Sequence, residues 1–181
     1  MPVQIGAKPE SSYEDPIGLL GDCHRRIERF LSVLVRVARD ARGGALNPEQ
    51  RAACETALRY FREAAPKHTA DEEESLFPRL RAMDRPGVRD VLARMEALES
   101  DHARAALDHL NADRLFHRWI AAGSLSPEDA GALAAAMGRL AALYRDHIAF
   151  EDRELFPTAA RALDPTTLAA IGAEVAARRR R

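Results

Sequence analysis

The chain has 181 residues, with 27 basic and 28 acidic side chains, six histidines and two cysteines, and its formal net charge is −1. This balance speaks against nucleic-acid binding, which normally requires a basic excess, and no run approaches the roughly 20 apolar residues of a membrane span. Residues 1–16 lack the apolar core of a signal peptide, so a soluble, cytoplasmic protein is expected. The length suits one domain with a single buried core.

Four long helices are predicted in chain order, followed by a short fifth: 16–42, 48–82, 86–121, 127–161 and 165–178. Four of the five starts combine a side chain that can cap free backbone amides with a following proline: Asp15-Pro16, Asn47-Pro48, Ser126-Pro127 and Asp164-Pro165. The glycines Gly43, Gly44 and Gly123 are typical helix ends, and residues 84–87 (Asp-Arg-Pro-Gly) form the remaining break. No run alternates between apolar and polar residues as a strand would.

Short connections make consecutive helices antiparallel neighbours, so the sequence predicts an all-α fold, an up-down-up-down four-helix bundle with a short fifth C-terminal helix. The expected layout is a flexible N-terminal segment at 1–14, the bundle at 15–161, and the last helix with its Arg-rich tail at 162–181. Pro66, Pro78 and Pro157 are predicted to kink or interrupt the second and fourth helices. The four final arginines, 178–181, are interpreted as a frayed helix end rather than a nucleic-acid-binding tail.

One pattern, His-x-x-x-Glu-x-x-x-Leu-Phe-Pro, occurs twice, at residues 68–78 and 147–157. Its first members are His68 with Glu72 and His147 with Glu151. Residues four apart share a helix face, so each pair presents an imidazole and a carboxylate in the same direction. A single pair of this kind is common by chance, but the duplication is not.

Two more histidines, His24 and His102, are predicted to lie level with the two in the repeat. About the turn near residue 85, for example, His68 and His102 are each 17 residues away (85 − 68 and 102 − 85). The other turns give mismatches of a few residues at most, about 3 Å along a helix. The bundle therefore gathers four imidazoles, one per helix, and two carboxylates at one level, which we interpret as a metal site.

Six such donors exceed the four that a structural zinc ion takes and suit two metal ions of higher coordination number. Symmetry suggests two histidines for each ion, with His24 and His68 on one and His102 and His147 on the other. Glu72 and Glu151 would then bridge the two ions. This arrangement leaves room for an oxide or hydroxide bridge and one open position on each ion. Ligand preference alone permits iron, manganese, zinc or copper.

These motifs resemble the hemerythrin-like family, also called HHE cation-binding domains, over residues 15 to about 160. The resemblance implies a four-helix bundle with two non-haem iron ions and the six residues above as metal ligands. The spacing is also similar to the di-iron domain of bacterial repair-of-iron-centres proteins. Oxygen-carrying hemerythrins have a second histidine on the third helix where this chain has Ala106, and an aspartate five residues beyond the last histidine, where Glu151 is only four beyond. These departures favour sensing of, or reaction with, O2, NO or peroxide over reversible oxygen carriage.

The competing ferritin-like class needs four carboxylates and two Glu-x-x-His motifs, and only the motif from Glu99 to His102 is present. Two anionic ligands instead of four favour the diferrous state and gas binding over iron oxidation. Three functions stay open. The leading one is a protein that binds or senses O2, NO or oxidants, or handles iron. The second is an enzyme acting on NO or peroxide, or repairing iron centres by donating iron. The third is a metal-free or single-metal structural bundle. The sequence predicts neither an oligomeric state nor a partner protein.

Residues near the predicted site carry further expectations. Asp22 and Asp101 are candidates either for orienting imidazoles or for facing water, while Glu28 is expected to face solvent or to support the ligands. Tyr144 is expected either to donate to a bound gas or to pack, and His109, about 10 Å beyond His102, to be an ordinary residue.

The acidic run at 71–74 is expected to be a solvated face apart from Glu72. Cys54 precedes His68 by 14 residues, about 21 Å of helix, whereas Cys23 is level with the site. No disulfide is therefore expected.

Overall fold

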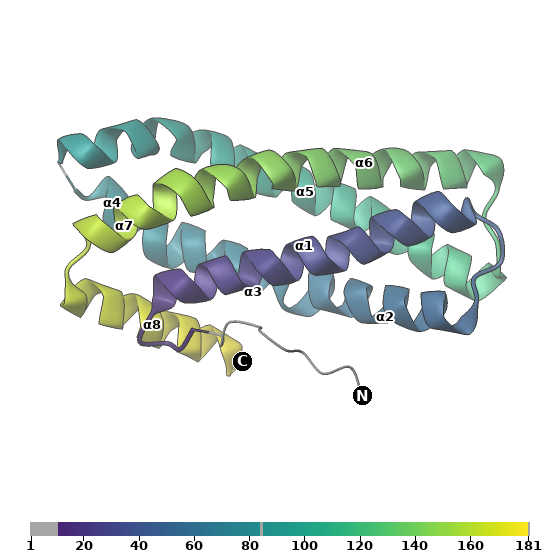
Figure 1. Cartoon of the computed structure of the whole chain (residues 1–181), viewed down its shortest axis with the longest axis horizontal. Coiled ribbons are helices and arrows are strands. Elements are labelled where there is room, and N and C mark those ends of the chain that lie inside the picture. Colours follow the sequence, from purple (N-terminus) through teal and green to yellow (C-terminus); the bar gives the residue numbers. More distant parts are fainter. Residues whose placement is uncertain (1–10, 84, 181) are drawn as a thin grey trace.

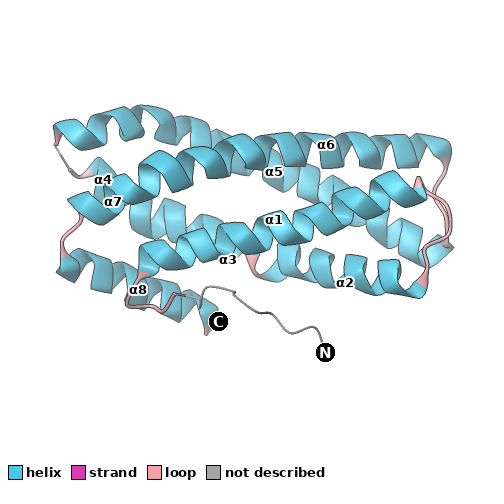
Figure 2. Ribbon diagram, viewed as in Figure 1, coloured by secondary structure: helices cyan, strands magenta, loops and turns pink. Residues whose placement is uncertain are grey.

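The computed structural model describes residues 11–83 and 85–180, and over these ranges the chain is an all-helical bundle (Figures 1 and 2). Four long helices follow the long axis: α1 (Pro16–Ala41), α2 (Pro48–Glu63), α5 (Pro86–Ala122) and α6 (Pro127–Phe150). Helices α1 and α5 each contact both α2 and α6, which closes the four into a ring. Residues 1–10 of the predicted N-terminal segment, Asp84 of the predicted break and Arg181 lie outside the described residues.

Shorter helical segments extend two of the long helices. After α2 come α3 (Ala65–Ala70), the π-helical segment η1 (Asp71–Leu76) and α4 (Phe77–Arg81). After α6 come the π-helical segment η2 (Glu151–Leu155) and α7 (Phe156–Ala162). The last helix, α8 (Pro165–Arg179), packs against α1 and η1, at the end of the bundle opposite the α1–α2 turn (Figure 1).

The predicted helix starts are confirmed. In each case a side-chain oxygen accepts the backbone N–H three residues later and proline occupies the first helical position; the capping residues are Asp15, Asn47, Ser126 and Asp164. Gly123 ends α5 with a φ of 80°, in the left-handed region that glycine adopts without strain. These helix starts can be predicted from sequence because capping and the preference for proline depend only on residues within one helical turn.

The second and fourth predicted helices are interrupted, as their prolines require. The break between α2 and α3 falls at Ala64, two residues before Pro66. Pro78 and Pro157 each follow a π-helical segment, in which the N–H of the preceding phenylalanine bonds to a carbonyl five residues back rather than four. This wider turn accommodates a proline that has no N–H and whose ring clashes with the carbonyl four residues back.

The apolar core consists of two clusters with a polar layer between them. One contains Trp119, Phe116 and neighbours from α1, α2, α5 and α6, and the other contains both Leu-Phe pairs of the repeat, which are almost fully buried. On α1, His24 lies between Leu20 of the second cluster and Ile27 of the first. The histidine layer therefore lies between two apolar clusters.

No helix in the described ranges is long and apolar enough to cross a bilayer. Both cysteines are free, as predicted, and both are buried.

Candidate metal centre

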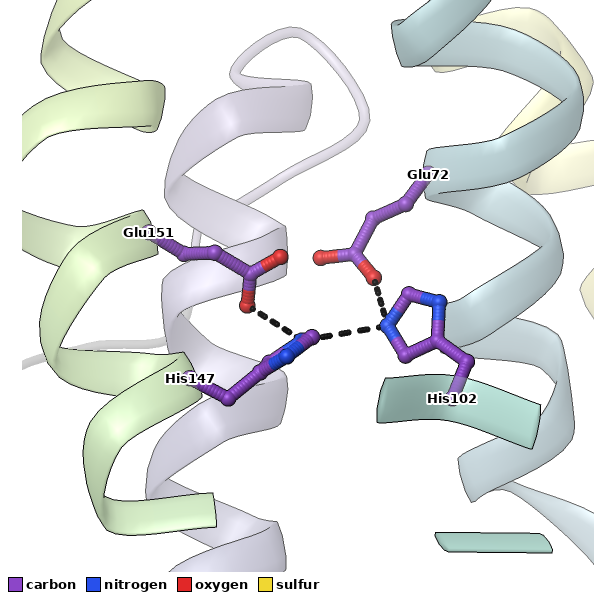
Figure 3. A group of neighbouring side chains, drawn as sticks. All are labelled: Glu72, His102, His147 and Glu151. Carbon is purple, nitrogen blue, oxygen red and sulfur yellow. Dashed lines mark hydrogen bonds and ion pairs between the residues drawn. The ribbon is translucent and has the colours of Figure 1, made fainter. Parts of the chain in front are cut away.

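All six residues predicted from the spacing come together in the bundle interior. His24 lies on α1, His68 on α3, His102 on α5 and His147 on α6. Of the two motif glutamates, Glu72 lies in η1 and Glu151 is the first residue of η2. Neither glutamate exposes any surface, and the most exposed imidazole, that of His102, retains only 9%. Figure 3 shows four of these side chains pointing toward one another.

Each carboxylate contacts histidines from two different helices. Oε1 of Glu72 lies 3.3 Å from Nε2 of His68, and its Oε2 lies 3.3 Å from Nε2 of His102. Oε2 of Glu151 lies 3.2 Å from Nε2 of His24 and 3.1 Å from Nε2 of His147. Both glutamates are thus placed between imidazoles, as bridging ligands must be.

The donor residues form two groups. Within each group, every residue offers one donor atom, and these atoms all lie within 4.8 Å of one another. The first is His24, His68 and Glu72, and the second is Glu72, His102, His147 and Glu151. Glu72 belongs to both. This division matches the histidine pairing predicted from symmetry, with two imidazoles in each group.

The outward nitrogens of three imidazoles are held by carboxylates. Nδ1–H of His24 donates to Asp152 (2.6 Å), that of His102 to Glu73 (2.7 Å), and that of His147 to Asp101 (3.4 Å). In a neutral imidazole, a proton fixed on Nδ1 leaves the Nε2 lone pair facing the centre, which is the arrangement of metal-bound histidines. The expectation for Asp101 is confirmed.

Sequence reasoning missed Glu73 and Asp152, although the repeat contained a signal. Each directly follows the motif glutamate, so both copies read His-x-x-x-Glu followed by a second acid. The expectation that the run at 71–74 is a solvated face is wrong for Asp71 as well, which is fully buried. Its carboxylate is paired with Arg178 and Arg179, each at 2.6 Å. Burial of this acid is possible because two arginines from α8 neutralise it.

The repeat also supports the histidines of the other two helices by stacking. Phe156 stacks on His24 with ring centroids 5.0 Å apart, and Phe77 is nearly parallel to His102 at 6.4 Å. Each copy therefore supplies two donors of its own, and orients the histidine of another helix with a carboxylate and a phenyl ring.

Asp22, Glu28 and Glu99 do not belong to the donor cluster. Asp22 does not orient His24; it accepts the backbone N–H of Ser11 and pairs with Arg25, and Asp152 orients His24 instead. Glu28 is exposed. Glu99 pairs with Arg81 at 2.7 Å instead of entering the donor cluster, which disfavours the ferritin-like alternative.

Tyr144 and His109 are hydrogen-bonded to each other: the hydroxyl of Tyr144 lies 3.0 Å from Nε2 of His109.

The interpretation of the final arginines as a frayed helix end is wrong for Arg178 and Arg179. Both lie in α8 and form ion pairs with the buried carboxylate of Asp71.

Burial and neighbouring charges shift the pKa values of several donor residues. Burial would lower the pKa of His24, but Asp152 and Glu151 raise it to about 10. Burial raises the pKa of Glu72 to about 7, and the charge of Glu151 adds to the effect. Burial holds the pKa of His68 well below its ordinary value. Metal ions must therefore displace protons from some of these donors, which makes metal binding pH-dependent.

The residues present fit a metal centre. Over the described part of the chain, all four carboxylate oxygens of Glu72 and Glu151 are buried and have no hydrogen-bond partner, and neither does Nε2 of His24. Buried polar atoms are normally paired, because leaving them unpaired is costly. Cations coordinated by these inward-facing nitrogens and oxygens would satisfy them, and a mixed imidazole–carboxylate set suits iron among several metals.

A cavity of about 460 Å³ adjoins the donor cluster, and its wall includes His24, His68, His102 and His147. It gives small molecules a route to the imidazoles.

Fold and site together define a helical bundle with His/Glu clusters suited to metal ions. The hemerythrin HHE cation-binding domain matches residues 15–159, and the chain belongs to this family. The resemblance inferred from the motifs is thereby confirmed, and membership implies metal binding, typically of iron. A comparison with curated proteins finds no significant match.

Proposed function

We propose that this chain binds two non-haem iron ions through the six clustered residues. His24 and His68 would hold one ion and His102 and His147 the other, with Glu72 and Glu151 bridging and an oxide or hydroxide completing the bridge. The observation that carries the proposal is the set of four buried carboxylate oxygens that have no hydrogen-bond partner and lie among inward-directed imidazole nitrogens. Bound iron would supply a redox couple and coordination positions open to a small ligand.

We further propose that the centre binds or senses O2, NO or a related oxidant. Two anionic ligands leave the centre more positive than a ferritin-like site, which favours the diferrous state. Access is supported by the cavity that reaches all four imidazoles. Ala106 carries no donor where oxygen-carrying hemerythrins have a further histidine, which favours an open coordination position.

The proposed frame is an up-down-up-down bundle, formed by α1, then α2 to α4, then α5, then α6 and α7. The ring of contacts among α1, α2, α5 and α6 supports this topology, and short connections favour antiparallel neighbours. Such a frame holds ligands from four directions at one level.

The test is anaerobic reconstitution with ferrous iron, followed by metal analysis and absorption spectra before and after addition of NO, and separately of O2. We expect two irons per chain and a new charge-transfer band with each gas. His147→Ala removes one donor and should reduce both iron content and band. His117→Ala is the matched control, because His117 is exposed and lies outside the donor cluster. One tightly held zinc ion and no spectral response to either gas would contradict the proposal.

The second candidate is an enzyme with the same centre, acting on NO or peroxide or donating iron for repair. The route from the cavity to the imidazoles favours it, because turnover needs repeated access. Catalytic loss of NO or peroxide, measured at many equivalents per chain, would establish turnover, and a single-equivalent response would assign binding alone.

A further inference from the structure

The cavity beside the donor cluster is much larger than a diatomic gas requires. Its volume of about 460 Å³ is roughly three times the ~150 Å³ that accommodates benzene in an engineered cavity. Along α1 its lining runs from His24 to Leu34, ten residues or about 15 Å. A space of this size and length lies in the range of pockets that bind organic molecules, roughly 300–1,000 Å³.

Small side chains create this space. Ala65, Ala105 and Ala112 are all buried and all line the cavity, where larger apolar residues would fill it. Leu34, Leu58 and Ile148 complete much of the remaining wall. The interior beyond the four histidines is thus mainly apolar, and an apolar occupant would gain from leaving water.

The cavity opens between the α2–α3 junction and α5. Pro66 on one side and Ala106 and Leu110 on the other are exposed and line it. Leu110 and its near neighbour Leu107 are the two most exposed large apolar side chains in the described ranges, at 69% and 65%. Arg62 is also exposed and lines the cavity, but the rest of this rim is apolar, which favours entry of an apolar molecule.

Besides the four imidazoles, polar side chains interrupt the apolar wall in three places: Thr69, the ion pair of Arg62 with Asp113 (3.6 Å), and the hydrogen-bonded pair of His109 and Tyr144. Phe61 stacks on His109 at 4.3 Å and fixes its ring. Burial lowers the pKa of His109 to about 4 and raises that of Tyr144 above its ordinary value, so both are neutral near pH 7. The pair can therefore offer a hydrogen bond to an uncharged group.

We propose that this cavity binds an uncharged, largely apolar organic molecule whose single hydroxyl or carbonyl group hydrogen-bonds to the His109–Tyr144 pair. The molecule would lie along the bundle axis with one end toward the four imidazoles. This inference goes beyond the proposed iron function and does not depend on which metal is bound. It assigns a role to His109, which the sequence alone marks as an ordinary residue.

The probes are 2-naphthol and naphthalene, which differ by one hydroxyl, titrated into the metal-loaded protein by calorimetry. We expect 2-naphthol to bind about fivefold more tightly than naphthalene, as one net hydrogen bond implies. Tyr144→Phe should reduce this ratio to near one, while naphthalene binding stays unchanged. The preference thus separates hydrogen bonding from simple hydrophobic uptake.

The second variant fills the cavity. Ala112→Leu should weaken the binding of both probes by about tenfold, because its added carbons occupy the space. Ala103→Leu is the matched control, since Ala103 is on the exposed face of α5, and its affinities should equal those of the wild type.

Absence of 2-naphthol binding, or binding that neither Tyr144→Phe nor Ala112→Leu alters, would overturn the proposal. Iron content is measured on the same samples. Loss of probe binding with two irons retained refutes only the cavity proposal, and probe binding without iron refutes only the iron proposal.

Discussion

At the residue scale, the centre depends on carboxylates that do not themselves face the metal position. Asp152 and Glu73 hold the outward nitrogens of His24 and His102, and so fix which nitrogen faces inward. Their conformations are set by the same helical turns that carry Glu151 and Glu72. Positioning and ligation are therefore coupled within each copy of the repeat.

Replacement of the carboxylate that orients His24 tests this role. We expect Asp152→Ala to lower iron affinity about tenfold or more, because the imidazole loses its fixed tautomer and orientation. The measurement is competition for ferrous iron against a chelator. Glu154→Ala is the control, since Glu154 lies on the same segment but is 58% exposed and pairs with Arg94 at the surface. Equal affinities for the two variants would refute an orienting role for Asp152.

His109 gives the metal-free protein a pH-dependent stability. Its pKa is about 4 in the folded state, below the ordinary value of 6.5, so the unfolded chain binds the proton more readily. The contribution is fully present above about pH 6.5 and is lost as the pH falls toward 4, by up to about 3 kcal/mol. Denaturant unfolding at several pH values should show a shallower decline for His109→Gln than for the wild type.

His117→Gln serves as the control for this experiment, because His117 is exposed. Its curve should parallel that of the wild type over the same pH interval. A wild-type curve parallel to that of His109→Gln would show that His109 titrates normally.

At the element scale, α8 clamps the segment that carries Glu72. Arg178 and Arg179 neutralise the buried carboxylate of Asp71, the residue directly before Glu72. Arg79 on α4 pairs with Glu174 of α8 at 2.7 Å, which adds a second link across the same contact. Helix α8 lies beyond residues 15–159, the part that matches the family domain.

Breaking this clamp leaves a buried charge without a partner. We expect the double variant Arg178→Ala/Arg179→Ala to lose about 3 kcal/mol in free energy of unfolding, since removal of one side of a buried ion pair is strongly destabilising. Adding Asp71→Asn should recover part of that loss, because the uncompensated charge is gone. A double variant as stable as the wild type would show that Arg178 and Arg179 do not contribute to stability through their ion pairs with Asp71.

The elements also show what local sequence can and cannot predict. Caps and prolines act within a few residues, so the starts at Pro16, Pro48, Pro127 and Pro165 were predictable. The interruptions before Pro78 and Pro157 were predictable too, but not their π-helical form. That form depends on how the preceding residues pack, with Leu76 and Leu155 anchored in a core formed by several helices.

At the scale of the whole molecule, regular helix geometry made the six-residue cluster predictable. A fixed rise per residue and short turns bring His24, His68, His102 and His147 to one level, whatever the details of packing. The partners of Asp71 were not predictable, because α8 reaches η1 only through tertiary contact. The cavity was not predictable either, since it reflects volume that side chains leave unfilled, as at Ala105 and Ala112.

The proposed di-iron centre can be tested by Mössbauer spectroscopy of the iron-reconstituted protein, combined with iron and protein quantification. We expect two irons per chain that are magnetically coupled in the oxidised state, because shared carboxylates and an oxygen bridge would join them. A single iron per chain, or two ions with no magnetic coupling, would contradict it.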